Sequence, residues 1–292
     1  MTTVLTRRGT LGTAAGALAA AALAACTKRS TKPPAGTTRQ HYGKLGDQFG
    51  DLYLPSGTPR GTVVLMHGGF WLADYTLDLM VPIGKALARA GWAVWNLEYR
   101  RLDAGGGYPS TFVDVAAGVD HLTKLRGVDH FTKLRGVDRG RVVLLGHSAG
   151  GHLAAWAASR TDKTPGGPPK VGISGVVSLA GVLDLVGGAR DNVGNGAIQQ
   201  LMGGTPEAVP ARYALGDPLS LAPAPCPVAC LHGTDDDVVP ATQSTGYVKV
   251  ASKAGGTASY DQVPGTHFTI IDPNDRAWAT TSRLVARLAG PS

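Results

Sequence analysis

The feature that most constrains this chain is a five-residue motif between an apolar segment and a helix-forming segment. Residues 146–150 read GHSAG and match the pattern G-x-S-x-G. The apolar residues 142–145 precede the motif. The alanine-rich residues 149–158 begin within the motif and continue beyond it. This order predicts a strand, a sharp turn and a helix, with Ser148 exposed in a strained backbone conformation between close-packed elements. The structural alternative is that the Ser148 side chain caps the helix.

Short β-branched segments alternate with amphipathic or alanine-rich segments through the rest of the chain. This alternation is typical of a mostly parallel central sheet flanked by helices. We expect strands at residues 62–66, 93–97, 141–145, 175–179, 228–231 and 259–263. We expect helices at residues 77–89, 111–125, 149–159, 241–254 and 276–288, and an antiparallel edge hairpin at residues 40–44 and 49–54.

The connection between residues 179 and 228 is too long for a simple crossover. Long connections in compact domains tend to be functional, and this one contains a helical candidate at residues 197–202. It predicts a small lid or a pocket wall, and the alternative is a structural excursion.

Composition indicates how many domains the chain forms and whether it binds nucleic acid. The 292 residues are 43% hydrophobic, which suffices for one full-sized core, and we expect residues 41–292 to form that domain. The net charge of +7 raises the possibility of nucleic-acid binding. Several basic residues precede the domain, however, at Arg7, Arg8, Lys28, Arg29, Lys32 and Arg39. The sequence has no basic segment with interleaved aromatic residues, so we expect no nucleic-acid partner.

The first 40 residues carry targeting features. Arg7 and Arg8 precede an alanine-rich apolar run that ends in Cys26. This run resembles a twin-arginine export signal joined to a lipobox, which implies a signal peptide at residues 1–25 and lipidation of Cys26. Residues 26–40 then form a lipidated tether, and the protein is an exported lipoprotein on the outer face of the cytoplasmic membrane. The alternative is a transmembrane anchor, for which the apolar run is short of the required ~20 residues.

Two further cysteines, Cys226 and Cys230, lie close together in the chain. In an extended segment they would be about 13 Å apart, which is too far for a disulfide. We therefore expect two free thiols, whereas a turn at Pro227 would permit a bridge.

A tandem repeat interrupts the regular pattern. Residues 118–126 (GVDHLTKLR) and 127–135 (GVDHFTKLR) differ only at Leu122 and Phe131. Two copies are too few for a solenoid. Because nine residues make ~2.5 helical turns, one straight helix would place the apolar residues of the two copies on opposite faces. We expect a break near Gly127 or Gly136, with one copy displaced outward.

A reactive serine needs a base and a group that orients the base, and the chain supplies both after Ser148. Residues 232–240 (HGTDDDVVP) follow a predicted strand and contain three adjacent aspartates, which chemistry alone does not separate. His267 is the last histidine in the sequence and directly follows the predicted strand at residues 259–263. We therefore expect Ser148 to act as nucleophile and His267 as general base.

Residues 67–71 (HGGFW) follow the predicted strand at residues 62–66. Backbone amides at such a strand exit can bind the negatively charged oxygen of a tetrahedral intermediate, worth ~2.7 to 4 kcal/mol per donor. We assign these oxyanion donors to Gly69 or Phe70 and to Ala149. The alternative for the glycines is an ordinary turn, and Trp71 either walls the acyl pocket or packs in the core.

Taken together, these segments resemble bacterial α/β-hydrolases of the esterase, lipase and kynurenine-formamidase-like group. The resemblance rests on residues 67–71, 98–101 (EYRR), 146–151 and 232–240. The chain is also similar to bifunctional feruloyl and acetyl-xylan esterases and to the catalytic domain of prolyl-oligopeptidase-like peptidases. The H-G-x-x-D-x-x-V-P pattern of these proteins selects Asp236 as the triad acid, with Asp237 as the second choice.

The resemblance implies an α/β-hydrolase fold with a small lid insertion and a serine esterase that needs no metal or organic cofactor. The alternatives are an amidase of the kynurenine-formamidase type, a prolyl-oligopeptidase-like peptidase and a lipoprotein that binds ligands without catalysis. The acyl group, the alcohol group and the oligomeric state stay open.

Overall fold

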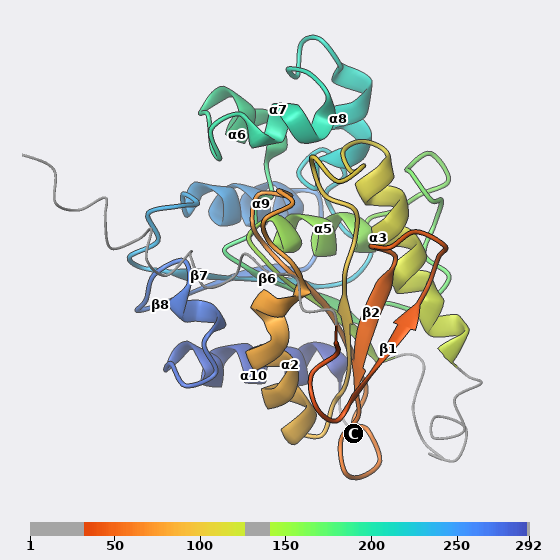
Figure 1. The fold of residues 1–292 in the computed structure, drawn as a ribbon. Coiled ribbons are helices and arrows are strands. Elements are labelled where there is room, and N and C mark those ends of the chain that lie inside the picture. The colour runs from red at the N-terminus through yellow and green to blue at the C-terminus, as the bar shows by residue number, and fades with distance from the viewer. Residues whose placement is uncertain (1–31, 126–140, 291–292) are drawn as a thin grey trace, which may run out of the picture.

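The computed structural model describes residues 32–125 and 141–290, which build one mixed sheet with helices on both faces (Figure 1). The strand order is β1-β2-β4-β3-β5-β6-β7-β8. β1 and β2 pair antiparallel, β2 is antiparallel to β4, and the other pairs are parallel, which confirms the expected mostly parallel sheet. The bounds are β1 (Thr37–His41), β2 (Phe49–Tyr53), β3 (Thr62–Met66), β4 (Ala93–Leu97), β5 (Val142–His147), β6 (Gly175–Leu179), β7 (Val228–Gly233) and β8 (Ala258–Val263).

Helices cover the two faces of the sheet in separate groups. One face carries α3 (Ser110–Asp120), α5 (Ala149–Ala158) and α9 (Thr242–Lys253), and the other carries α2 (Val81–Arg89) and α10 (Ala277–Ala289) (Figure 1). α2 is preceded by a 3-10 turn, Leu77–Met80, so the single helix expected at residues 77–89 is divided in two.

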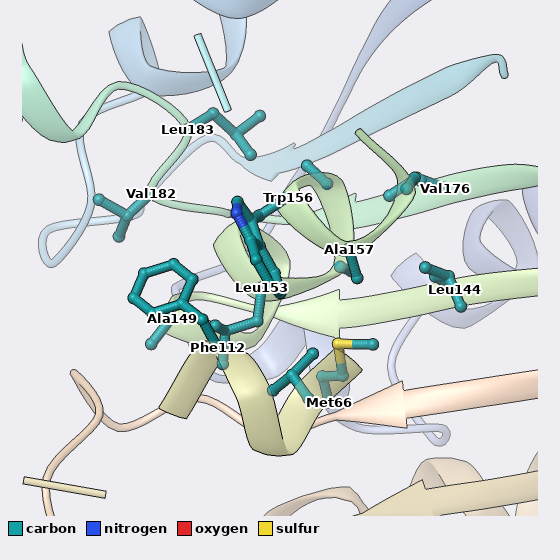
Figure 2. Packing of buried hydrophobic residues seen from close by; sticks show 14 of the residues in the cluster. Met66, Phe112, Leu144, Ala149, Leu153, Trp156, Ala157, Val176, Val182 and Leu183 are labelled. Carbon is teal, nitrogen blue, oxygen red and sulfur yellow. The ribbon is translucent and has the colours of Figure 1, made fainter. Parts of the chain in front are cut away.

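The hydrophobic core lies in two layers because strand side chains alternate between the faces. Along β3, Val64 and Met66 belong to the cluster under α5, and Val63 and Leu65 belong to the cluster above α10 and α2. Figure 2 shows Leu153, Trp156 and Ala157 of α5 packed among side chains from the strands and from α3. Each such buried Leu or Val contributes roughly 1.5 to 3 kcal/mol, so the sheet holds α5, and with it the motif serine, in a fixed place.

The first strand lies earlier than expected. We predicted a strand at residues 40–44 and placed the tether as far as residue 40, whereas β1 spans Thr37–His41. Arg39 explains the difference, because its guanidinium makes hydrogen bonds of 2.8 and 2.9 Å to the Asp51 carboxylate in β2 and lies 4.1 Å from the Phe49 ring centroid. These contacts stabilise the edge pair at a position that β-propensity alone does not reveal.

The first copy of the repeat begins within α3 and continues beyond it. The helix expected at residues 111–125 ends at Asp120, and a 3-10 turn, His121–Thr123, follows. The Asp120 carboxylate accepts hydrogen bonds from the Arg160 guanidinium at 2.6 Å and from the Lys170 main-chain amide at 3.1 Å. These bonds fix the end of the helix against a segment that is distant in the sequence. Gly118 packs closely against β4, because an added Cβ would lie 2.3 Å from a Leu97 methyl carbon and would force that side chain to move.

Several predictions fall outside the described residues. These are the signal peptide, the lipidation of Cys26, the second repeat copy and the break near Gly127 or Gly136. Within residues 32–125 and 141–290, no helix is long and apolar enough to span a bilayer. Cys226 and Cys230 are free thiols, as expected from their spacing.

Candidate active site

Ser148 lies in a sharp turn between β5 and α5, with φ of 56° and ψ of −120°. Its side chain makes no capping hydrogen bond to α5, so the helix-cap alternative is wrong. The Ser148 amide donates to the Leu179 carbonyl at 2.9 Å, and the Ser148 carbonyl accepts from the His152 amide at 3.1 Å. These bonds hold a left-handed conformation that costs a residue with a side chain about 1 to 3 kcal/mol.

The motif glycines allow the strand and the helix to approach closely at this turn. A Cβ added to Gly146 would lie 2.0 Å from the Gly150 carbonyl oxygen. A Cβ added to Gly150 would lie 2.1 Å from the Met66 carbonyl oxygen and 2.5 Å from that of His67. Because these neighbours are backbone atoms, they cannot rotate away, and both positions require glycine.

Gly150→Ala should therefore lower the free energy of unfolding by about 3 kcal/mol, because α5 must move away from β3 to admit the methyl group. Gly246→Ala in α9 is the matched control, since no atom lies within 4 Å of the added Cβ. That change should stabilise the protein by up to ~1 kcal/mol through helix propensity. Urea unfolding of the two variants measures both effects, and equal stabilities would contradict this packing.

Asp236 and His267 are brought together from the ends of β7 and β8. His267 Nδ1 lies 2.7 Å from Asp236 Oδ2, and the other carboxylate oxygen accepts 2.9 Å hydrogen bonds from the Val238 and Val239 amides. Since Asp236 accepts the proton on Nδ1, the His267 ring presents Nε2 as its basic nitrogen. The neighbouring Asp235 and Asp237 are exposed, so among the three aspartates only Asp236 contacts His267.

Ser148 and His267 are both buried, and the residue before Ser148 contacts His267. They are 1% and 2% exposed, and the ring of His147, the residue before Ser148, lies 4.5 Å from the His267 ring, centroid to centroid. Within the described residues, no hydrogen bond joins Ser148 Oγ to His267. The structure thus pairs Asp236 with His267 and brings His147, the residue before Ser148, against the loop that carries His267. Hydrogen bonds to a nucleophile are often long in unliganded enzymes and tighten when substrate binds.

Electrostatics keeps the Asp236 carboxylate ionised. Burial by itself raises the pKa of Asp236, but hydrogen bonds from His232 and His267 and the positive charge of His267 outweigh it. The pKa of Asp236 consequently lies well below its ordinary value. An ionised Asp236 can stabilise the imidazolium that His267 forms when it takes a proton.

The loop at residues 67–71 lies against the serine turn. A Cβ added to Gly68 would be 3.0 Å from Ser148 Cβ, and Gly69, Phe70 and Trp71 all have positive φ values. In the described part of the chain, no acceptor is bonded to the amides of Gly69, Phe70 and Ala149. The predicted oxyanion donors are therefore beside Ser148 and uncommitted to other acceptors.

Trp71 is fully buried in the core, with its ring edge-on to the His152 ring at 5.2 Å between centroids. This environment agrees with the packing alternative better than with an exposed pocket wall.

Three motif histidines support these loops, a role that our sequence reasoning did not assign. His147 Nε2 lies 2.8 Å from the His267 carbonyl oxygen. His232 Nε2 lies 2.8 Å from the Val239 carbonyl oxygen and 3.3 Å from Asp236 Oδ2. The available signal was positional, because each histidine stands beside a motif glycine at the carboxyl end of a parallel strand.

The third histidine, His67, explains the EYRR segment. Its Nε2 lies 3.0 Å from Glu98 Oε1, and the Tyr99 hydroxyl donates to the His67 carbonyl at 2.8 Å. Arg101 lies 3.0 Å from the same Glu98 oxygen. Burial raises the pKa of Glu98, but the charges of His67 and Arg101 bring it below its ordinary value, so this buried network holds the loop at residues 67–71.

The long connection forms three short helices, α6 (Leu185–Arg190), α7 (Ala197–Met202) and α8 (Pro210–Gly216), which lie beyond the α5 side of the sheet (Figure 1). It reaches the candidate site at Gly194, where an added Cβ would lie 2.5 Å from the Phe70 ring. The expected helix at residues 197–202 is confirmed, and the connection is in contact with a predicted oxyanion residue.

Asp217 anchors this insertion and should make its stability depend on pH. Its buried carboxylate accepts from the Leu185 amide at 2.9 Å and from the Ser220 hydroxyl at 2.9 Å, and burial raises its pKa to about 6. For an acid whose pKa rises on folding, the stabilisation is complete below the unfolded pKa, 3.8, and is lost as the pH rises through 6. As the pH rises from 4 to 7, the contribution of Asp217 to the free energy of unfolding should therefore fall by about 2 kcal/mol.

Asp217→Asn should abolish that contribution while keeping the hydrogen-bond geometry. Urea unfolding of the parent and the variant at pH 4 and pH 7 isolates it, because all other titrating groups are shared. The same pH dependence in both proteins would show that Asp217 does not titrate in this range.

The fold and the site together define a class of protein. A mostly parallel sheet with a strained serine turn after β5 and an Asp–His pair after β7 and β8 is the arrangement of the α/β-hydrolase fold. A truncated carbohydrate esterase from gut microbiota has the same fold, with a TM-score of 0.70 and 22% identity over 88% of this chain and 99% of that one. Esterase B from Lactobacillus rhamnosis, inhibited by a tributyrin phosphonate, has a TM-score of 0.70 and 20% identity over 93% of this chain and 92% of that one.

Residues 50–250 match the BD-FAE family, and the chain belongs to that family. The kynurenine formamidase of Danio rerio is also similar, with 24% identity over 264 residues, which are 86% of this chain and 81% of that protein.

Proposed function

We propose that the protein is a serine hydrolase that cleaves carboxylic esters, with Ser148 as nucleophile, His267 as general base and Asp236 orienting the base. The observation that carries this proposal is the 2.7 Å hydrogen bond between His267 Nδ1 and Asp236 Oδ2, beside the strained turn of Ser148. Nucleophile, base and orienting acid are the three groups that acyl transfer by serine requires.

The proposed reaction proceeds through a covalent intermediate. Ser148 Oγ forms a bond to the ester carbonyl carbon while its proton passes to His267 Nε2, and the carbonyl π electrons move to the oxygen. When the carbonyl re-forms, the bond to the alcohol oxygen breaks and the alcohol takes the proton from His267. Water then repeats both steps on the acyl-enzyme, which releases the carboxylic acid and restores Ser148.

We assign the oxyanion site to the amides of Phe70 or Gly69 and of Ala149. The Gly69 and Phe70 amides lie in the loop at residues 67–71, and Ala149 begins α5. The hydrogen-bond network of Glu98 and the packing of α5 hold these donors in place before substrate arrives, which is what makes such a site effective. The burial of Ser148 and His267 strengthens the interactions, because the local dielectric is low.

The chemical class of substrate is supported by the relatives. Membership of the BD-FAE family and the likeness in fold to two esterases favour ester cleavage. A second candidate, hydrolysis of an aryl formamide, is favoured by the similarity to kynurenine formamidase. Both reactions use the same three residues, so only substrates separate them.

The test compares acetyl, butyryl, longer-chain and feruloyl esters with N-formylkynurenine on the purified protein. The proposal predicts that the best ester has a kcat/KM at least about tenfold above that of the formamide. A formamide preferred over every ester would establish the second candidate, and no turnover of any substrate would contradict both.

A further inference from the structure

His147 connects the serine turn with the loop that carries the base. It is the last residue of β5, directly before Ser148, and is 1% exposed. Its Nε2 lies 2.8 Å from the carbonyl oxygen of His267, although the two residues are 120 positions apart in the chain. Because a carbonyl can only accept, His147 must carry its proton on Nε2 and donate to His267.

The ring of His147 makes no other hydrogen bond in the described part of the chain. Its Nδ1 is buried and unpaired, and an added Cβ on Gly68 would lie 2.9 Å from this nitrogen. Burial, with the nearby positive charge of His267, lowers the pKa of His147 to about 3. His147 therefore stays neutral and places no second positive charge beside the imidazolium of His267 during catalysis.

Among the residues that the structure describes, no main-chain hydrogen bond joins the loop around His267 to the serine turn. The Asp235 amide donates to the Gly265 carbonyl at 2.9 Å, and Thr266 and Thr269 bond each other within the loop. The His267 side chain is held by Asp236. These bonds fix the loop to β7 and to itself, whereas the bond from His147 fixes it to the residue beside the nucleophile.

We propose that His147 is a positioning residue that sets the distance between Ser148 and His267 by donating a hydrogen bond to the His267 main-chain carbonyl. This inference rests on the proposed function. A displacement of about 1 Å between reacting groups can cost about a hundredfold in rate, so losing this bond should lower kcat rather than substrate affinity.

The test is a matched pair of substitutions, His147→Gln and His147→Met. Glutamine and methionine have similar length and flexibility, but only glutamine carries an N–H group near the position of the histidine Nε2. We expect His147→Met to lower kcat about 10- to 100-fold with KM within about twofold of the parent, and His147→Gln to recover most of that loss.

His152→Met is the control for a purely structural effect. His152 is also buried, and its Nε2 lies 2.9 Å from a main-chain carbonyl, but that carbonyl belongs to Gly216 in α8. His152→Met should lower the melting temperature as His147→Met does, while kcat stays within about twofold of the parent.

The outcomes separate this inference from the proposed function. If the parent and His147→Met turn over esters with equal kcat, or if the loss appears in KM alone, His147 does not position the base although the esterase proposal stands. If glutamine restores nothing that methionine lost, the hydrogen bond is not the cause. A parent without ester turnover or phosphonate labelling would overturn both proposals.

Discussion

Ser148→Ala should lower kcat for a short-chain ester roughly a millionfold, to the rate supported by binding and the oxyanion site alone. Alanine keeps the Cβ and the left-handed backbone of residue 148, so the turn between β5 and α5 should form as before. Only the hydroxyl that attacks the carbonyl is lost. Release of a chromogenic alcohol measures the effect.

Ser159→Ala provides the control for this substitution. Ser159 follows the same helix, and its hydroxyl donates to the Ala155 carbonyl at 2.9 Å, away from His267. This variant should keep the parent kcat within about twofold. Retained turnover in Ser148→Ala, with an unfolding midpoint like that of the parent, would refute the assignment of the nucleophile.

Asp236→Asn should lower kcat about 10⁴-fold. The carboxylate of Asp236 accepts the proton of His267 Nδ1, whereas the asparagine side chain can present an N–H at the same place. The imidazole then carries its proton on Nε2, so Nε2 is no longer available as the basic nitrogen. The imidazolium also loses the negative charge that stabilises it. Because volume and backbone contacts are nearly unchanged, the melting temperature should fall much less than the activity.

The neighbouring aspartates supply controls of the same chemistry. Asp235→Asn and Asp237→Asn remove one negative charge each from the same loop, but both residues are exposed. Each should leave kcat within about threefold of the parent at moderate ionic strength. A loss in Asp237→Asn that equals the loss in Asp236→Asn would show that the aspartate contacting His267 is not the one that matters.

Local sequence patterns predicted the parts of this fold that local interactions determine. β3, β4 and β6 begin and end where their β-branched segments do, and the glycine-flanked turn at Ser148 forms between β5 and α5. The sequence also predicted that Asp236 and His267 each follow the end of a strand. In a parallel sheet these ends lie along one edge, which explains why residues far apart in sequence could be predicted as neighbours.

The parts that were wrong or missed depend on contacts between distant residues. β1 is positioned by Arg39 and Asp51, and α3 ends where Asp120 meets Arg160, which is 40 residues away. The bond from His147 to the His267 carbonyl involves a main-chain atom, so no pairing of residue types could reveal it. Such contacts become visible only once the fold has brought the segments together.

Mass mapping of a fluorophosphonate adduct on the purified protein tests the central claim most directly. A phosphonate reacts with a serine only when a neighbouring base removes the hydroxyl proton. The arrangement of Ser148, His267 and Asp236 predicts one adduct per chain, on the peptide that contains Ser148, with loss of ester turnover in proportion to labelling. An adduct on another residue, or turnover that persists after Ser148 is fully labelled, would contradict it.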